Sequence, residues 1–284
     1  MYNFSIGILL DSLRLPFAEA VEKAAAAGAA GVQMYLTRGQ VHPSEITEKT
    51  VKERLDIINS HGLTVSAICG DLGGGFGNTE ENPRKIELSK RILEMTMLFG
   101  TNIVTTHIGV VPEDKNDPKY SIMQEACGQL AEYADSLGGH FAVETGPESA
   151  ITLKGFLDSL NSRGVAVNLD PANLVMVAGD DPVKAVYTLK DYIVHTHAKD
   201  GVKLTDPDAG KLCGEEHLKE LLDAGKTYKE FPLGSGKVDF DRYLAALNEI
   251  GYNGYLTIER EGGDDRVGDV ARAVKFLESK IGKK

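Results

Sequence analysis

The chain has 284 residues, of which 42% are hydrophobic and 26% charged, and its formal net charge is −11. Such an acidic chain repels phosphate backbones, and its basic residues are scattered among acids, so we expect no nucleic-acid partner. The closing Lys283-Lys284 pair is too short to form a basic patch. No apolar run approaches the roughly 20 residues that span a bilayer, which predicts no membrane helix.

Cysteine usage and the first residues indicate a cytoplasmic protein. Cys69, Cys127 and Cys213 lie far apart without a CxxC pair, so neither a disulfide framework nor a zinc knuckle is indicated. A reducing compartment is the simpler interpretation. The opening MYNFSIGILLDS has no basic region and no small-residue cleavage site, and it predicts a strand rather than a signal peptide.

Short β-branched runs alternate with longer amphipathic runs along the whole chain. The predicted strands are, in order, 4–10, 31–36, 64–69, 102–109, 140–146, 165–170, 193–200 and 254–260. The predicted helices are 16–28, 47–60, 82–100, 120–137, 151–163, 182–191, 239–251 and 267–281. Most strands are nearly continuous apolar runs, as expected when both faces of a parallel sheet are buried. Eight such units predict an α/β fold, a single (β/α)8 TIM barrel over 1–284.

Three segments bear on this prediction. The connection at about 201–232 is too long for a routine βα loop. We expect a short helix at 217–225 within it, in a loop that folds over the barrel mouth or contacts a second subunit. An open doubly wound sheet is the alternative fold, but no GxGxxG opens a helix after the first strand. The glycine-rich 71–78 lacks the Lys-Ser/Thr of a P-loop, so we expect a mobile loop over the site.

Polar side chains end the later strands, where barrels of this kind carry their chemistry. They are His107, Glu144, Asp170 with Asn173, the run His195, His197, Lys199 and Asp200, and Glu259. Taken singly, a strand-end acid is more often a helix cap or an ion-pair partner, and a lone histidine is more often structural. Four consecutive strands with metal-capable ends are harder to explain that way. Clustered carboxylates repel unless a cation lies among them, so the pattern predicts a divalent-metal site.

The motifs AVETG, NLDPAN, HTHAKD, LGSGKVDF and TIERE resemble the xylose-isomerase-like TIM-barrel superfamily of sugar (phosphate) isomerases and epimerases. Its relatives include ketose 3-epimerases, hydroxypyruvate isomerase, inosose dehydratase and endonuclease IV. The resemblance covers essentially the whole chain and implies a metal shell of Glu144, Asp170, His197 and Glu259. In the relatives the second His of the HxH pair is the ligand, which favours His197 over His195. The oxygen-rich set suits Mn²⁺ first, with Mg²⁺, Co²⁺ or Zn²⁺ as alternatives.

The chain also departs from individual branches of this superfamily. Asn173 stands where ketose 3-epimerases usually carry a histidine, and Gly146 stands where xylose isomerases proper have a lysine. The HAKD form, with Lys199 and Asp200, is more similar to the inosose-dehydratase and sugar-phosphate-isomerase branches. The endonuclease needs three zinc ions and more histidines than this inventory supplies. These departures leave the substrate open.

The resemblance implies a metal-dependent isomerase or epimerase that acts on a small sugar or sugar phosphate. Glu144 and Glu259 would pass a proton through an enediolate as base and acid. Substrate contacts are expected among His107, His195, Lys199, Asp200 and Asn173. Alternatively, His195 could pack beside His197, His107 could be a packed residue, and Lys199 and Asp200 could form a rim ion pair. Backbone N–H groups at 234–236 could cradle a phosphate or a sugar hydroxyl, or form only a flexible turn.

Two other functions fit the same residues. An inosose-type dehydratase would use the same metal, with Lys199 or His195 as the acid for the departing water. A non-catalytic sugar-binding barrel would keep the carboxylates as structural ion pairs. Relatives are often dimers or tetramers, so a homo-oligomer is expected by analogy.

Overall fold

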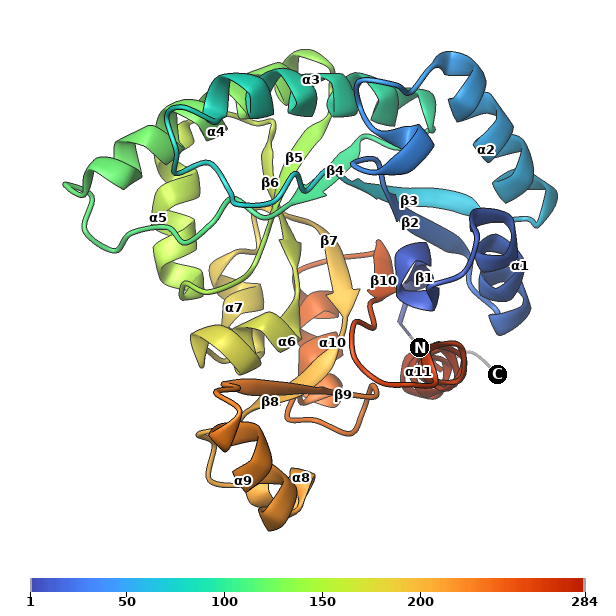
Figure 1. Ribbon diagram of the computed structural model, residues 1–284, viewed down its shortest axis with the longest axis vertical. Helices are drawn as coiled ribbons and strands as arrows, with labels where there is room; N and C mark the ends of the chain where they lie inside the picture. Colours follow the sequence, from blue (N-terminus) through green and yellow to red (C-terminus); the bar gives the residue numbers. More distant parts are fainter. Residues whose placement is uncertain (1, 283–284) are drawn as a thin grey trace.

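The computed structural model describes residues 2–282, so Met1, Lys283 and Lys284 lie outside the described residues. Eight parallel strands close into a barrel, as Figure 1 shows. They are β1 (Ser5–Leu9), β2 (Gly31–Tyr35), β3 (Thr64–Cys69), β4 (Ile103–Thr106), β5 (His140–Glu144), β6 (Val165–Leu169), β7 (Ile193–Ala198) and β10 (Tyr255–Ile258). Their order around the barrel is β1-β10-β7-β6-β5-β4-β3-β2, which confirms the predicted (β/α)8 fold.

Helices surround the barrel and connect its strands (Figure 1). The long ones are α1 (Phe17–Ala27), α2 (Glu48–Ser60), α3 (Asn82–Leu98), α4 (Pro118–Ser136), α5 (Ala150–Leu160), α7 (Pro182–Thr188), α10 (Phe240–Glu249) and α11 (Arg266–Ile281). Short turns of helix, η1 (Leu10–Leu13), η2 (Gly39–Val41), α6 (Pro171–Asn173) and η3 (Leu174–Ala178), lie in the loops. In residues 2–282 no helix combines the length and apolar character needed to cross a bilayer.

Local signals account for most helix ends, with one exception. Helix α1 stops at Gly28, whose φ of 99° is a left-handed conformation that glycine adopts without strain. Asn82 does not cap α3 as its sequence position suggests, because Glu81 holds the capping position and Asn82 is already helical. The Asn82 amide instead donates to the carbonyl of Phe76 over 3.0 Å and ties the glycine-rich loop to the helix.

The barrel interior is apolar over most of its length and polar in one layer. Branched side chains such as Ile8, Ile68 and Val143 are almost fully buried and belong to one continuous core. Five buried polar residues on five strands interrupt it: Gln33, Thr105, Asn168, His195 and Thr257. Each of them hydrogen-bonds to another member of the set. We call these five residues the lower polar layer.

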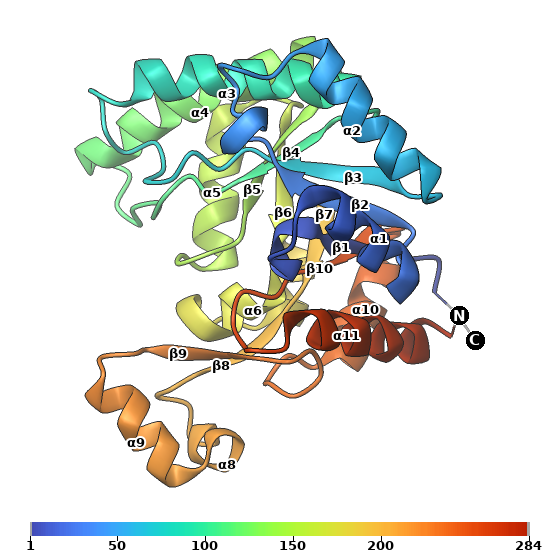
Figure 2. The ribbon, with the colours of Figure 1, turned by 45° about the vertical axis from the view of Figure 1, so that its right-hand side comes forward.

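The long connection after β7 forms an arm. It contains β8 (Asp200–Lys203), α8 (Ala209–Cys213), α9 (Glu215–Asp223) and β9 (Tyr228–Phe231). Strands β8 and β9 pair antiparallel, and a small apolar cluster around Val202 and Leu204 lies beneath the two helices. Figures 1 and 2 both show the arm protruding beyond the end of β7, outside the ring of barrel helices. Helix α9 corresponds to the short helix predicted at 217–225.

Candidate metal centre

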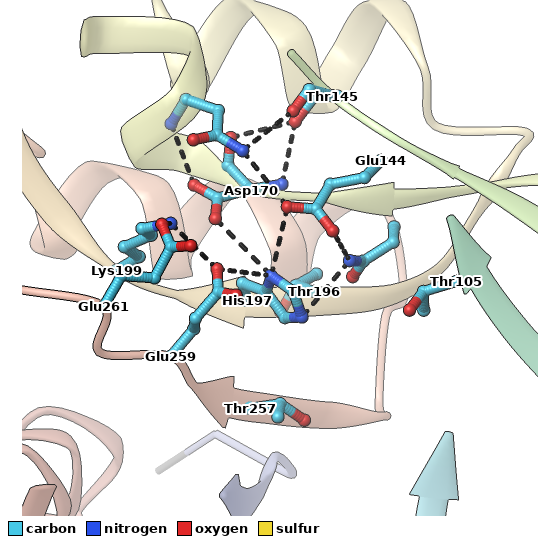
Figure 3. A network of polar contacts seen from close by, with 12 residues as sticks. Thr105, Glu144, Thr145, Asp170, Thr196, His197, Lys199, Thr257, Glu259 and Glu261 are labelled. Carbon is cyan, nitrogen blue, oxygen red and sulfur yellow. Dashed lines mark hydrogen bonds and ion pairs between the residues drawn. The ribbon is translucent and has the colours of Figure 1, made fainter. Parts of the chain in front are cut away.

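Four buried side chains from neighbouring strands converge at the carboxyl end of the barrel. Glu144 ends β5, Asp170 follows β6, His197 lies on β7 and Glu259 follows β10. Each offers one ligand atom, and these atoms all lie within 4.8 Å of one another. Nδ1 of His197 is the centre of the group, at 3.5 Å from Oε1 of Glu144, 3.4 Å from Oδ2 of Asp170 and 3.3 Å from Oε2 of Glu259 (Figure 3).

Two atoms at this centre have no hydrogen-bond partner among the described residues. They are Oδ2 of Asp170 and Nδ1 of His197, and both are buried. The other oxygen of Asp170, Oδ1, accepts the backbone N–H of Asn173 at 2.9 Å and caps α6. Asp170 therefore has a capping oxygen and a second oxygen that faces His197. Leaving a buried polar atom unpaired costs about 1–3 kcal/mol, so a site of this kind calls for a further partner.

The charges at the centre also fit a cation. Three buried carboxylates, of Glu144, Asp170 and Glu259, stand against one buried ammonium, of Lys199. These carboxylates outnumber the ammonium, and a metal cation could take the place of the proton that they favour on His197. Burial raises the pKa of Asp170. Burial alone would lower the pKa of His197, but Glu144 and Glu259 outweigh it and raise that pKa well above its ordinary value. Three oxygens and one imidazole nitrogen thus fit a divalent metal.

The lower polar layer sets the tautomer of His197. Nε2 of His197 lies 2.9 Å from Oε1 of Gln33, and Nε2 of Gln33 donates to Oγ1 of Thr105 over 2.8 Å. Because the Gln33 amide is oriented by Thr105, its oxygen faces the imidazole and Nε2 of His197 carries the proton. Nδ1 is then the nitrogen that faces the carboxylates, which favour a proton there, and it is the atom that would bind a metal once that proton leaves. The strand register shifts at Gln33, which re-aims side chains there.

Of the two expectations for His195, packing beside His197 or contact with substrate, the hydrogen bonds of its ring favour the first. Nδ1 of His195 donates to Oδ1 of Asn168 over 2.8 Å, and Nε2 accepts from Oγ1 of Thr257 at 2.8 Å. Burial and the neighbouring His197 lower its pKa well below the ordinary value, so this imidazole is neutral. Nδ2 of Asn168 in turn donates to Oε2 of Glu144 over 3.1 Å. His195 is therefore part of a chain of hydrogen bonds that holds Glu144.

Asp200 and the glycine loop at 234–236 also differ from expectation. The Asp200 carboxylate turns away from the centre and accepts the backbone N–H groups of Gly201, Gly234, Gly236 and Val238. A Cβ at Gly236 would collide with that carboxylate, which explains the glycine. The loop therefore cradles a carboxylate of its own chain instead of a phosphate or a sugar hydroxyl. Asp200 forms neither an ion pair with Lys199 nor a wall of the site.

The remaining predicted residues lie at the centre and divide between the two glutamates. Lys199 is 4% exposed, and its Nζ lies 3.0 Å from Oε2 of Glu259 and also pairs with Glu261. Burial opposes its charge, but Glu259 and Asp170 raise its pKa well above the ordinary value. Burial alone would raise the pKa of Glu259, but the charge of Lys199 outweighs burial and holds that pKa well below its usual range.

Glu144 has a different set of partners. Nε2 of His107 lies 3.5 Å from its Oε1, and Nδ1 of His107 lies 3.2 Å from Oδ2 of Asp71. The charge of Glu144 is the main reason that the pKa of His107 rises to about 10. Nδ2 of Asn173 donates to the same Oε1 of Glu144 over 3.1 Å. The His107 side chain is 44% exposed, so it connects Glu144 with solvent.

Sequence reasoning missed four residues that shape the centre: Gln33, Asn168, Tyr35 and Asp71. A signal existed for the first two, because each is a lone polar residue within an apolar strand, GVQMYL and VAVNLD. A polar residue buried in a parallel sheet must find a partner, and here the partners are the metal-capable side chains. Tyr35 and Asp71 follow no such pattern.

Comparisons with known proteins agree with this fold. A sequence model of the family described as "Xylose isomerase-like TIM barrel" matches residues 21–280. The xylose isomerase domain protein of Planctomyces limnophilus is 26% identical with a TM-score of 0.80, over 100% of this chain and 99% of that one. A D-tagatose 3-epimerase-like protein, 18% identical with a TM-score of 0.73 over 99% of each chain, shares the fold.

A shorter match is to inosose dehydratase of Lacticaseibacillus casei. It is 27% identical over 122 residues, which is 43% of this chain and 39% of that protein. The family match covers most of this chain's length and seven of the eight barrel strands, β2 to β10. The chain belongs to the xylose isomerase-like TIM barrel family.

Proposed function

We propose that the chain is a divalent-metal-dependent enzyme that removes a proton from the carbon next to the carbonyl of a small polyhydroxy compound. A proton then returns to the neighbouring carbon, as in sugar isomerases, or to the opposite face of the same carbon, as in epimerases. The observation that carries the proposal is the pair of glutamates on either side of His197, each with its own nitrogen donors. Glu144, Asp170, His197 and Glu259 are the proposed ligands. Mn²⁺ is the ion we expect first, with Mg²⁺, Co²⁺ and Zn²⁺ as alternatives.

When bound, the cation would act as a Lewis acid that stabilises the negative charge developing on a substrate carbonyl oxygen. The proton itself is moved by the chain. One glutamate takes the proton from the carbon next to the carbonyl, leaving an enediolate, and the other returns a proton. Oε1 of Glu259 accepts no hydrogen bond from residues 2–282 and is open to substrate. Both oxygens of Glu144 are held, by Asn173 and Asn168.

Each glutamate has a path by which its proton exchanges with water. Glu259 contacts Lys199, whose ammonium also contacts the 65% exposed Glu261. Glu144 contacts His107, which is partly exposed. Because both paths reach solvent, a proton taken from substrate is replaced by one from water. We therefore expect turnover in D₂O to place deuterium on carbon.

A dehydratase on the same centre is the second candidate. The similarity to inosose dehydratase favours it, and so does the protonated Lys199 beside Glu259. Proton removal would be the same, but loss of a neighbouring hydroxyl as water would follow in place of reprotonation, with Lys199 or His107 as the acid. His195 is not available for this role, because both of its ring nitrogens are bonded to protein.

The test is a screen of ketoses, ketose phosphates and inososes in D₂O with Mn²⁺, read by proton NMR. We expect deuterium on carbon for an isomerase or epimerase, and an enone absorbance with an inosose for a dehydratase. Glu144→Gln should abolish the reaction. The control Glu216→Gln, an exposed glutamate of α9, should leave it unchanged. Full exchange by Glu144→Gln, or binding of a sugar with no exchange by the unmodified protein, would contradict the proposal.

A further inference from the structure

A cavity of about 170 Å³ lies against the metal centre on the side of β1 and β2. Its wall includes Tyr35 and three carboxylates, of Asp11, Glu259 and Glu261, and it is rich in arginine: Arg14, Arg38, Arg260 and Arg266. We propose that this cavity binds an anionic substituent of the substrate, a phosphate or a carboxylate, while the reacting carbons lie at the centre. This inference rests on the proposed function, because it treats the anion as part of the molecule that the glutamates act on.

Arg266 is the strongest observation. It is 9% exposed, it lines the cavity, and its Nε is buried without a hydrogen-bond partner among residues 2–282. One of its other nitrogens, Nη1, donates to the carbonyl of Arg260 over 2.7 Å, which fixes the guanidinium in place. A buried guanidinium N–H without an acceptor is costly, and an oxyanion is the acceptor that fits its fork of donors.

The position of Arg266 in the fold supports the same ligand. It is the first residue of α11, a helix of 16 residues. The amino end of a helix carries a partial positive charge, which favours an anion beside it. Neither Arg266 nor Arg14 forms an ion pair within the described part of the chain. Burial and the charge of Arg14 lower the pKa of Arg266, so the two cations lie close enough to repel each other.

Arg14 and Arg38 add positive charge at the open side of the cavity. Arg14 is exposed and adopts a φ of 54°, a left-handed conformation that is uncommon for a residue other than glycine or asparagine. The Arg38 guanidinium lies 4.0 Å from the centroid of the Tyr35 ring, and its only ion pair in the described residues is with Asp11 at 3.6 Å. Both arginines can therefore accept an anion without breaking a buried contact.

Arg260 lines the same cavity, but two carboxylates of the protein balance its charge. Its Nη1 lies 2.8 Å from Oε1 of Glu230, and its Nε lies 2.9 Å from Oδ2 of Asp269. Both carboxylates compensate its charge within the protein. Asp11 pairs with Arg38, and Glu261 pairs with Lys199. Among the described residues, the arginines of the cavity that lack a carboxylate partner are therefore Arg14 and Arg266. An anion at this point would be held beside Glu259 and within reach of the metal centre.

The experiment is isothermal titration calorimetry of the full chain, loaded with Mn²⁺, with inorganic phosphate and, separately, with acetate. We expect at least one of the two anions to bind, and the tighter of the two identifies the substituent. Arg266→Gln and Arg14→Gln should each weaken that anion by roughly tenfold or more, since each removes a charge-assisted contact. Arg163→Gln is the matched control, because Arg163 is 90% exposed and, within residues 2–282, pairs with Asp135 alone.

Three results would overturn the inference. The first is that neither anion binds. The second is that the unmodified chain and both arginine variants bind the anion equally well. The third is that Arg163→Gln weakens anion binding as much as the other two variants do. Equal binding in the variants would mean that the metal alone holds the anion. If Arg266→Gln does not fold, the exposed Arg14→Gln decides the question. Anion binding without deuterium exchange would defeat only the proposed function, whereas exchange into a neutral ketose without anion binding would defeat only this inference.

Discussion

The two histidines of β7 point to the same side of one strand, with ring centroids 5.8 Å apart, yet their surroundings are opposite. His195 lies in the lower polar layer, where Asn168 and Thr257 satisfy both of its nitrogens. His197 lies among three carboxylates and has an unpaired Nδ1. Burial and the neighbouring charge of His197 lower the pKa of His195, and the carboxylates raise that of His197.

This contrast distinguishes the lower polar layer, which supports the site, from the metal centre, where the proposed reaction takes place. In the lower polar layer neutral groups satisfy one another, which suits a rigid scaffold in a low-dielectric interior. At the centre above it, like charges crowd together and two polar atoms lack partners, which suits a site that a cation completes. Asn168 and Gln33 join the two, since each contacts a member of both layers. The following predictions test that division.

The largest effect should come from His197→Gln. This change removes the one nitrogen among the four proposed ligands and leaves the three carboxylates in place. We expect Mn²⁺ affinity to fall by more than the roughly 100-fold that changes behind the ligands typically cost. Equilibrium dialysis against Mn²⁺ measures it. Unchanged affinity would show that His197 is not a ligand and would remove the distinction between the two layers.

Asn168→Ala should have the next largest effect. It removes the hydrogen bond to Oε2 of Glu144 without touching a ligand atom. We expect a 10- to 100-fold loss of Mn²⁺ affinity and of exchange rate, because a residue of this kind orients the ligand. The control is Asn253→Ala, an exposed asparagine in the loop before β10. Equal losses in both variants would indicate a general effect on stability.

A buried carboxylate outside the centre shows how an acid behaves without a cation. Glu148 is 7% exposed, and burial raises its pKa from 4.5 to about 7. The folded state therefore binds this proton more tightly than the unfolded state does. Stability from Glu148 is fully present below pH 4.5 and is lost as the pH rises through about 7, by about 3 kcal/mol in all.

Urea unfolding at pH 5 and pH 8 tests this point. Glu148→Gln removes the titrating group but keeps an oxygen that can accept the N–H of Val111. The variant should lose less stability than the unmodified protein between the two pH values, so the difference in unfolding free energy should favour the variant at pH 8. A difference that does not change with pH would show that Glu148 is ionised in the folded protein throughout.

The smallest effect should come from His195→Leu. This change leaves Oδ1 of Asn168 and the hydroxyl of Thr257 without their partner. We expect the free energy of unfolding to fall by about 1–2 kcal/mol, within the range for buried groups that lose a hydrogen bond. Mn²⁺ should still bind one ion per chain at saturation, as calorimetry would show. Complete loss of the ion would place His195 in the centre itself.

Sequence patterns carried the prediction of the barrel and of the four converging side chains. The alternation of apolar strands and amphipathic helices is local, and a parallel barrel brings consecutive strand ends together. The partners of His195 are not local, because Asn168 and Thr257 lie 27 and 62 residues away. The register shift at Asn168 also changes which side chains meet, and no short motif encodes it. Those contacts decide which histidine is free.

The orientation of Asp200 is a second feature that local sequence does not predict. Lys199 and Asp200 are consecutive, so they point to opposite faces and cannot both line the centre. Alternation alone does not tell which of them turns inward. The answer comes from the loop at 234–238, whose N–H groups surround Asp200. That loop is more than 30 residues away along the chain, beyond the arm.

The central claim is that Glu144, Asp170, His197 and Glu259 together bind one divalent ion. Titration of the metal-free chain with Mn²⁺, followed by electron paramagnetic resonance, tests it most directly. Free Mn²⁺ gives a strong spectrum that binding to protein suppresses. We predict suppression up to one equivalent per chain in the unmodified protein and none in His197→Gln. A free-ion spectrum that grows from the first addition to the unmodified protein would contradict the account.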